Sequence, residues 1–234
     1  MQITFDERIT DYDISGGSLS FKYGADEGAI AGAVTINDIS IGRYVQPEEY
    51  DFEIAPSFED PDRCAVYHYT GDSPEMIVPS YVYYGNQYRE VIEIFTSGFE
   101  SHPIETAILP DTIASLGDRV FTDCQELTSV SFGDDSQFES IPHSAFNSCS
   151  QLTSINIPNS VTTIGESAFS TCYSLPSIDI PVNVTLIGPS AFDSCDALET
   201  INFAGTMEQF ANITKEQGWA SGIPAEVVHC TDGD

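Results

Sequence analysis

Four cysteines recur at nearly equal spacing in the second half of the chain, and each follows a phenylalanine by three positions. They are Cys124, Cys149, Cys172 and Cys195, which lie 25, 23 and 23 residues apart. Zinc sites use close pairs such as Cys-x-x-Cys, which this sequence lacks. If successive cysteines stacked on coils about 4.8 Å apart, a disulfide would be geometrically possible. We expect a reduced ladder instead, because a small buried thiol packs as a compact hydrophobic group.

The other candidates for chemistry are the remaining cysteines and the histidines. Cys64 and Cys230 stand outside the repeated spacing, and we assign them no role. Neither a metal-binding spacing nor a catalytic-triad arrangement occurs among the histidines, which are His68, His102, His143 and His229. No Gly-x-Ser-x-Gly, phosphate-binding loop or dinucleotide-binding motif occurs. We therefore predict no catalytic, cofactor-binding or metal-ligating residues, no cofactor, and a protein that is not an enzyme.

Short acidic turns could supply the oxygen ligands that Ca²⁺ prefers. These turns are 59–62, 133–136 and 231–234. None matches the spacing of an EF-hand calcium loop, so we interpret them as ordinary acidic turns and leave calcium binding open.

The cysteines belong to a longer repeat, which must position them. Residues 157–180 and 180–203 match in phase over their whole length, and other apolar columns keep the same step. The columns are Leu127, Leu152, Leu175 and Leu198; Val130, Ile155, Ile178 and Ile201; and Leu116, Ile141, Ile164 and Ile187. Self-similarity at such a period, with leucine and isoleucine columns, is typical of a leucine-rich solenoid. We predict about four full repeats of about 23 residues, flanked by caps.

The pattern Ile-Pro-x-x-Val-Thr-x-Ile-Gly-x-x-Ala-Phe-x-x-Cys-x-x-Leu-x-x-Ile-x-Ile resembles the BspA-like, or Treponema-type, leucine-rich repeat. The resemblance covers residues 108–230, roughly half of the chain. The first repeat departs most, with Arg119 and Val120 in place of Ser-Ala, but the buried columns are kept. Members of this family occur on bacterial surfaces, in some protozoa and in phage virions. The resemblance implies binding and adhesion, and it brings no catalytic residues.

Each repeat should contain a short helical or 3₁₀ turn at Ala-Phe-x-x-Cys and a short strand at Leu-x-x-Ile-x-Ile. Gly117, Gly165 and Gly188 precede the phenylalanine by four residues, which we interpret as a tight turn. Residues 95–109 should form a degenerate first coil, because the end of an array must cover an apolar face. At the other end we expect a short helix over 206–211 and a last strand over 227–229.

The first 95 residues contain no such repeat and read as short strands separated by glycine, proline and aspartate. The expected strands are Gln2–Phe5, Ser18–Tyr23, Ala29–Ile36, Tyr50–Ile54, Ala65–Tyr69, Ile77–Tyr84 and Tyr88–Phe95. Their spacing favours an antiparallel sandwich or barrel-like domain. The predicted fold class is therefore mainly β with short helices, in two domains. These are a β-rich docking domain over 1–95 and a leucine-rich-repeat solenoid with its C-terminal cap over 96–234.

Within each repeat strand the column residues point inward, so period-two alternation sends their neighbours outward. The outward residues form two rows: Ser129, Ser154, Ser177 and Thr200; and Ser131, Asn156, Asp179 and Asn202. Small hydroxyl and amide groups offer hydrogen bonds without blocking the approach of a partner. We predict that these residues form a binding face for a protein or glycan, although no aromatic row is present for stacking on sugars.

The chain has 7 basic and 37 acidic residues, a net charge of −30. This charge repels phosphate backbones and anionic membranes, so we expect no nucleic-acid partner. No run of about 18 apolar residues occurs, so we expect no membrane insertion. The N-terminus lacks the basic and apolar regions of a secretory signal peptide. We interpret this as a protein made in a cytoplasm without export, as phage virion proteins are.

These observations favour a non-enzymatic structural and interaction protein. We predict a phage virion or appendage component whose repeats bind a protein or host-surface ligand, with other virion proteins as partners and a homo-oligomer as one possible assembly. Two alternatives stay open. One is a bacterial cell-surface adhesin fragment, and the other is a carbohydrate-related accessory module or enzyme with its site in the N-terminal half.

Overall fold

The computed structural model describes residues 9–15, 18–23, 51–85, 87–133 and 135–233. The chain forms two compact units, residues 1–41 and residues 42–234. In the first unit, β1 (Ile9–Ser15) and β2 (Ser18–Tyr23) pair antiparallel. Two of the predicted strands lie outside the described residues: Gln2–Phe5 and Ala29–Ile36.

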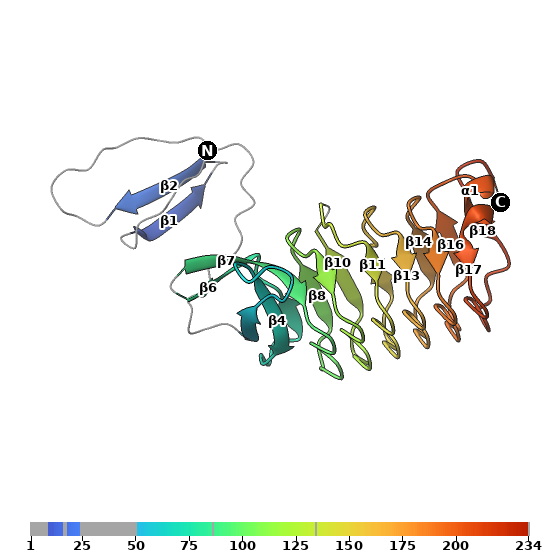
Figure 1. Ribbon diagram of the computed structural model, residues 1–234, viewed down its shortest axis with the longest axis horizontal. Coiled ribbons are helices and arrows are strands. Elements are labelled where there is room, and N and C mark those ends of the chain that lie inside the picture. Colours follow the sequence, from blue (N-terminus) through green and yellow to red (C-terminus); the bar gives the residue numbers. More distant parts are fainter. Residues whose placement is uncertain (1–8, 16–17, 24–50, 86, 134, 234) are drawn as a thin grey trace. The chain divides into compact units, whose positions relative to one another are not determined.

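The second unit contains a β-solenoid of about seven turns, and the protein is mainly β. In Figure 1 the coils follow one another in sequence order, from the green coil around β8 to the red coils at the C-terminus. Two ladders of short parallel strands run along the array, one on each side of a shared core. This architecture confirms the predicted leucine-rich-repeat solenoid.

The first ladder carries the outward rows predicted from the sequence. Within the described residues its strands are β5 (Glu75–Ile77), β8 (Thr106–Leu109), β10 (Ser129–Phe132), β12 (Ser154–Ile155), β14 (Ser177–Ile180), β16 (Thr200–Phe203) and β18 (Val228–His229). The pairing is parallel and in register, with Ser129 opposite both Thr106 and Ser154. Strand pairing is interrupted between β12 and β14, so the ladder consists of the sheets β12-β10-β8-β5 and β14-β16-β18.

The second ladder lies on the other side of the core. Within the described residues its strands are β4 (Cys64–Tyr69), β7 (Gln87–Ile94), β9 (Ser115–Leu116), β11 (Ser140–Ile141), β13 (Thr163–Ile164), β15 (Leu186–Ile187) and β17 (Thr214–Lys215). One residue per rung forms a buried column, which includes Val66, Ile94, Leu116, Ile141, Ile164 and Ile187. Lys215 lies opposite Ile187 on the last rung.

Both ladders begin before residue 95. β5 pairs in parallel with β8, and β4 pairs in parallel with β7. β3 (Phe52–Pro56) pairs antiparallel with β4, and β6 (Tyr81–Tyr84) pairs antiparallel with β7. The predicted strand Ile77–Tyr84 is divided between β5 and β6, because Pro79 has no N–H for a ladder bond. The predicted domain boundary at residue 95 stays a prediction.

One phenylalanine per coil forms a continuous stack inside the solenoid. Adjacent ring centroids lie 5.3 Å apart for Phe121 and Phe146, and 5.2 Å apart for Phe146 and Phe169. The Phe169 and Phe192 rings are parallel to within 1° at 5.3 Å. All four side chains are fully buried. Each such side chain contributes about 1.5–3 kcal/mol through burial, so the stack is a main source of stability.

The Ala-Phe-x-x-Cys segment is a series of turns and not the predicted helical or 3₁₀ turn. Asn147 N donates to Ser144 O within its coil, whereas Phe146 N donates to Ala168 O of the following coil. Ser144 and Ser148 have φ values of 53° and 62°, and their N–H groups also donate to the following coil. Because every second amide is committed to the neighbouring coil, a continuous helix cannot form here.

The repeated glycines allow neighbouring coils to approach closely, which corrects the tight-turn interpretation. None of the three has a positive φ. A Cβ on Gly188 would lie 2.6 Å from Glu166 N, and one on Gly117 would lie 2.2 Å from Thr96 N. The side chain is therefore excluded by the backbone of the preceding coil.

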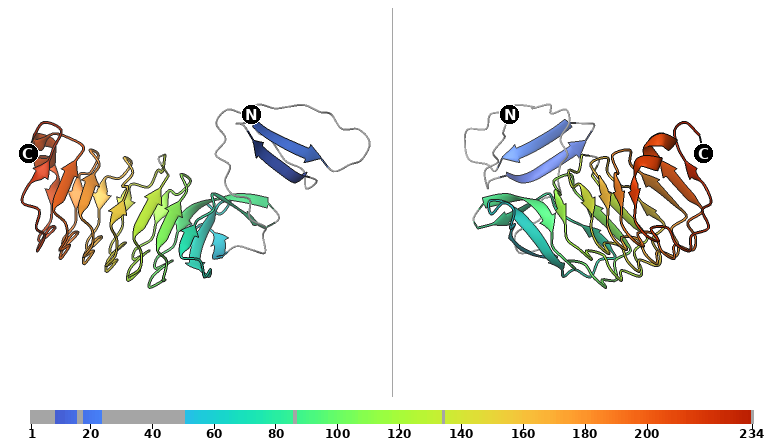
Figure 2. Two further views of the ribbon diagram at one scale, coloured as in Figure 1. Left: turned by 180° about the vertical axis from the view of Figure 1, so that it is seen from behind. Right: turned by 45° about the vertical axis from the view of Figure 1, so that its right-hand side comes forward.

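The C-terminal end of the array is closed by a cap, visible in both views of Figure 2. Helix α1 (Met207–Asn212) begins with a capping box, in which Thr206 Oγ1 accepts from Gln209 N and Gln209 Oε1 accepts from Thr206 N. The Trp219 ring meets the last stacked ring, Phe192, edge-on, with centroids 6.3 Å apart. The helix and β18 confirm the predicted C-terminal end of the array, whereas coils before residue 95 show that 95–109 is not its first coil.

Candidate binding surface

The outward side chains of the first ladder form one surface, which we call the strand face. The strand register and, between β12 and β14, the matching repeat positions give two rows: Glu75, Thr106, Ser129, Ser154, Ser177 and Thr200; and Ile77, Ile108, Ser131, Asn156, Asp179, Asn202 and His229. All eight sequence-predicted residues lie in these rows, and each is exposed or half-buried. The structure therefore brings them together on one surface, while their binding role stays a prediction.

Three of the polar side chains on the strand face already have partners within it. Asn156 Oδ1 accepts from Phe132 N, and Asn156 Nδ2 donates to Phe132 O, both at 3.0 Å. β12 ends at Ile155, so this amide takes the place of the missing strand residue. Asn202 Nδ2 donates to Asp179 Oδ1 at 2.7 Å, which holds the carboxylate in one orientation.

The strand face extends beyond the predicted residues to an exposed apolar pair. Ile77 and Ile108 lie opposite each other on β5 and β8 and are 39% and 41% exposed. Their neighbours Met76 and Ala107 are buried, so both isoleucines point outward by alternation. Sequence reasoning missed the pair because it drew the outward rows only through the four full repeats, and both isoleucines precede these. The alternation in Thr106–Leu109 was the available signal.

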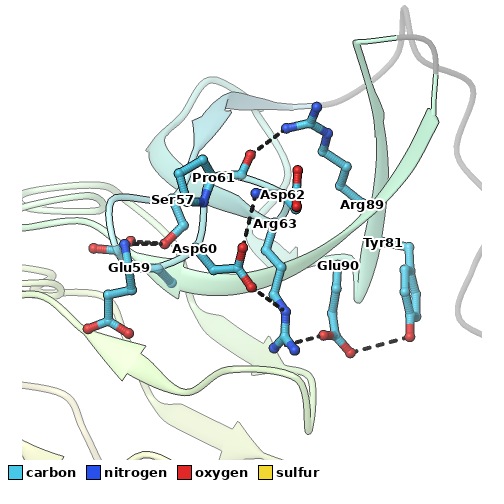
Figure 3. Close-up of polar contacts among 10 residues, drawn as sticks. Ser57, Glu59, Asp60, Pro61, Asp62, Arg63, Tyr81, Arg89 and Glu90 are labelled. Atoms are coloured by element: carbon cyan, nitrogen blue, oxygen red, sulfur yellow. Dashed lines mark hydrogen bonds and ion pairs between the residues drawn. The ribbon is translucent and has the colours of Figure 1, made fainter.

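The strand face and the two residues before each of its strands carry carboxylates, and no lysine or arginine occurs among the described residues there. The exposed carboxylates are Glu75, Glu105, Asp179, Glu199 and Glu226. In the described parts of 51–233 the basic residues lie elsewhere and have partners. Figure 3 shows Arg63 between Asp60 and Glu90, at 3.2 and 3.1 Å, and Arg89 donating to Pro61 O at 2.7 Å. Arg119 pairs with Glu100, and Lys215 Nζ donates to Phe210 O and Ile213 O.

The repeat cysteines belong to the core and not to this surface. The six cysteines form no disulfide, and Cys230 alone is only half-buried. Each repeat thiol donates to the carbonyl of a phenylalanine in the preceding coil, as Cys172 Sγ does to Phe146 O at 3.2 Å. Burial raises the pKa of the Cys124 and Cys195 thiols to about 12. These groups are therefore unsuited to nucleophilic chemistry at neutral pH.

No group of three or more histidine, cysteine, aspartate or glutamate side chains in the described ranges is arranged to hold a metal ion. Among the same residues, no helix is both long and apolar enough to cross a membrane.

Solved structures show what the chain is similar to. A leucine rich cell surface protein from Faecalibacterium prausnitzii has a TM-score of 0.66 and 25% identity, over 80% of this chain and 48% of its own. A leucine rich repeat protein from Treponema pallidum has a TM-score of 0.59 and 25% identity, over 72% and 79%. A leucine-rich repeat protein from Bacteroides ovatus has a TM-score of 0.59 and 24% identity, over 67% and 42%.

The chain thus spans about half the length of the Faecalibacterium protein. No curated protein matches the sequence. A family model described as the BspA type leucine rich repeat region matches residues 92–214 in six copies. Together with the repeated columns, the turns and the two ladders, this match shows that the chain belongs to the BspA-type leucine-rich repeat family.

Proposed function

We propose that the chain is a non-enzymatic interaction module of a bacterial cell-surface protein, and that it binds a protein partner through the strand face. The observation that carries this proposal is the strand face itself. It presents two rows of mostly small polar side chains, from β5 to β18, over a buried core. The cell-surface location is supported by the printed name of the Faecalibacterium relative.

A surface of this kind suits binding because its backbone is held rigid. Parallel strand pairing within the sheets and backbone hydrogen bonds between successive turns hold each coil against the next. Little conformational freedom is therefore lost when a partner docks, and that loss otherwise weakens association. The same rigidity keeps the buried groups of the core out of reach of a substrate.

Other roles predicted from the sequence stay predictions. They are the virion location, homo-oligomerisation, the docking role of residues 1–95 and a carbohydrate-related site in that half. The matched structures named here are bacterial proteins, which is why the cell-surface role is the one proposed.

An adhesion assay tests the proposal. Beads coated with the protein are counted on cell monolayers, before and after protease treatment of the cells. The double variant Ser154→Arg and Ser177→Arg places two long cationic side chains in the centre of the strand face. We expect it to abolish bead binding, and we expect protease treatment of the cells to do the same.

The matched control adds two arginines away from the strand face. Ala114→Arg and Val182→Arg replace exposed residues in the segments between the two ladders. This control should bind as the wild type does. Unchanged binding by the Ser154/Ser177 variant would place the contact elsewhere and refute the proposal.

A further inference from the structure

The second row of the strand face combines an apolar patch with a fixed carboxylate. Ile77 and Ile108 supply the patch on β5 and β8. Asp179 lies on β14, where Asn202 holds one of its oxygens and leaves the other available. Between them stand only Ser131, which is small, and Asn156, whose amide is bonded to the Phe132 backbone. A ligand could therefore lie flat from one end to the other.

We propose that the strand face binds an extended, cationic polypeptide segment that runs across the strands. One apolar side chain of the segment packs on Ile77 and Ile108, and a lysine or arginine pairs with Asp179. This inference rests on the proposed function and specifies the chemistry of the partner.

The spacing of the two anchor points fits an extended chain. Ile108 lies opposite Ser131, and Asn156 and Asp179 hold the same repeat position in the next two coils, so Ile108 and Asp179 are three coils apart. Steps of about 5 Å place them roughly 15 Å apart, and an extended chain advances about 3.3 Å per residue. The apolar and basic residues of the partner should therefore be about four positions apart. An even number also puts both side chains on the same side of an extended segment.

The charge of the surface selects a cationic partner. Five exposed carboxylates lie on the strand face or beside it, without lysine or arginine among the described residues there. Complementary charge speeds association and rejects partners of like charge. Anionic glycans and acidic peptides should therefore be excluded.

The same rows argue for a polypeptide over a neutral glycan. Sugar binding commonly uses aromatic rings as stacking surfaces, and neither row of the strand face contains a phenylalanine, tyrosine or tryptophan. An exposed isoleucine pair instead suits an aliphatic side chain, whose burial is favourable in proportion to its area.

Labelled peptides test the inference by fluorescence anisotropy with the whole chain. The probe is a nine-residue peptide with three lysines, one of them four positions from its single leucine, made in both chain directions. Companion peptides replace leucine with serine, change the separation from four residues to three, or replace all lysines with glutamates. We expect binding by at least one direction of the probe, weakened by each change and by added salt.

Variants locate the contact. Ile108→Ser and Asp179→Asn should each weaken binding of the probe about tenfold, as expected for loss of an apolar anchor or a charge-assisted pair. Val182→Ser and Asp196→Asn alter exposed residues outside the rows and should leave binding unchanged. Thermal unfolding of every variant confirms that it is folded, and Ile77→Ser provides a second test of the patch.

Several results would overturn the inference. They are equal binding of the lysine and glutamate peptides, insensitivity to both Ile108→Ser and Asp179→Asn, or binding of neutral oligosaccharides in place of the peptides. The adhesion assay separates this failure from failure of the proposed function. If the Ser154/Ser177 variant loses adhesion but the wild-type protein binds none of the peptides, only the cationic segment is refuted. If that variant keeps its adhesion, both the proposed function and the cationic segment are refuted.

Discussion

At the scale of the single residue, the position of the repeat cysteine shows how the surroundings of a side chain determine which residue type fits. In later coils this place holds a buried thiol that donates to a carbonyl of the preceding coil. His102 takes it in the coil before that of Cys124, three residues after Phe99, with its ring edge-on to Tyr69 at 4.8 Å. Its Nδ1 is buried without a hydrogen-bond partner. A thiol fits this space as a compact hydrophobic group, whereas an imidazole leaves a polar atom unsatisfied.

The repeat thiols should resist alkylation in the folded protein. A pKa of about 12 for Cys124 and Cys195 leaves about one thiolate in ten thousand at pH 8, and both side chains are buried. Mass spectrometry after iodoacetamide treatment should find these two cysteines, with Cys149 and Cys172, unlabelled until guanidinium chloride is added. Rapid labelling of Cys149 in the folded protein would show that the core is open at that coil.

His102 should make the folded state sensitive to acid. Burial, with a smaller effect of His68, lowers the pKa of His102 below the ordinary value of 6.5. Between that lowered pKa and 6.5 the unfolded chain binds more protons, so this contribution to stability is lost as the pH falls. Denaturant titrations at pH 7 and pH 5 should show the wild type losing stability relative to His102→Gln. Replacement of exposed His143 by glutamine serves as the control, and a constant difference between wild type and His102→Gln would contradict the assignment.

At the scale of the element, each coil is a set of turns whose hydrogen bonds are shared with its neighbours. Alternate amides of the Ala-Phe-x-x-Cys segment donate to the following coil. In three of the four repeats a glycine stands four residues before the phenylalanine, and it lets the backbones approach closely; these are Gly117, Gly165 and Gly188. Coil spacing therefore depends on a residue without a side chain as much as on the stacked rings.

Gly188→Ala should destabilise the solenoid by about 1–3 kcal/mol, the usual cost of overpacking a close contact. The added Cβ would meet Glu166 N and the Gly165 carbonyl carbon, at 2.6 and 2.8 Å, and these backbone atoms cannot move aside alone. Urea unfolding measures the change. Ser177→Ala, on the exposed strand face, should stay within about 0.5 kcal/mol. Equal effects of the two substitutions would show that the coils can separate freely.

At the scale of the whole molecule, the net negative charge lowers the stability of the folded state. The chain carries −30, and the basic residues described in 51–233 are already engaged by carboxylates or carbonyls. The surplus carboxylates repel one another, which favours the expanded chain over the compact one.

The melting temperature should therefore rise with ionic strength. Raising NaCl from 0.01 to 0.1 M shortens the screening length from about 30 to about 10 Å, so repulsion between separated carboxylates weakens. We expect an increase of a few degrees, measured by circular dichroism. A fall in melting temperature over this range would mean that exposed ion pairs, such as the one between Arg63 and Glu90, outweigh the repulsion.

The sequence alone determined the repeat, the core columns and the eight polar residues of the strand face. Each of these depends on periodicity within a coil: Phe169 and Cys172 recur because every coil fills the same interior, and Ser177 points outward because Ile178 points inward. The tertiary structure decided what depends on the neighbouring coil. It showed that Asn156 completes a strand, that Gly188 makes room for a backbone, and that Ile77 and Ile108 extend the strand face. Contacts between coils join residues more than twenty positions apart. The sequence pattern within one coil does not indicate which backbone atom of the neighbouring coil will lie opposite a given side chain.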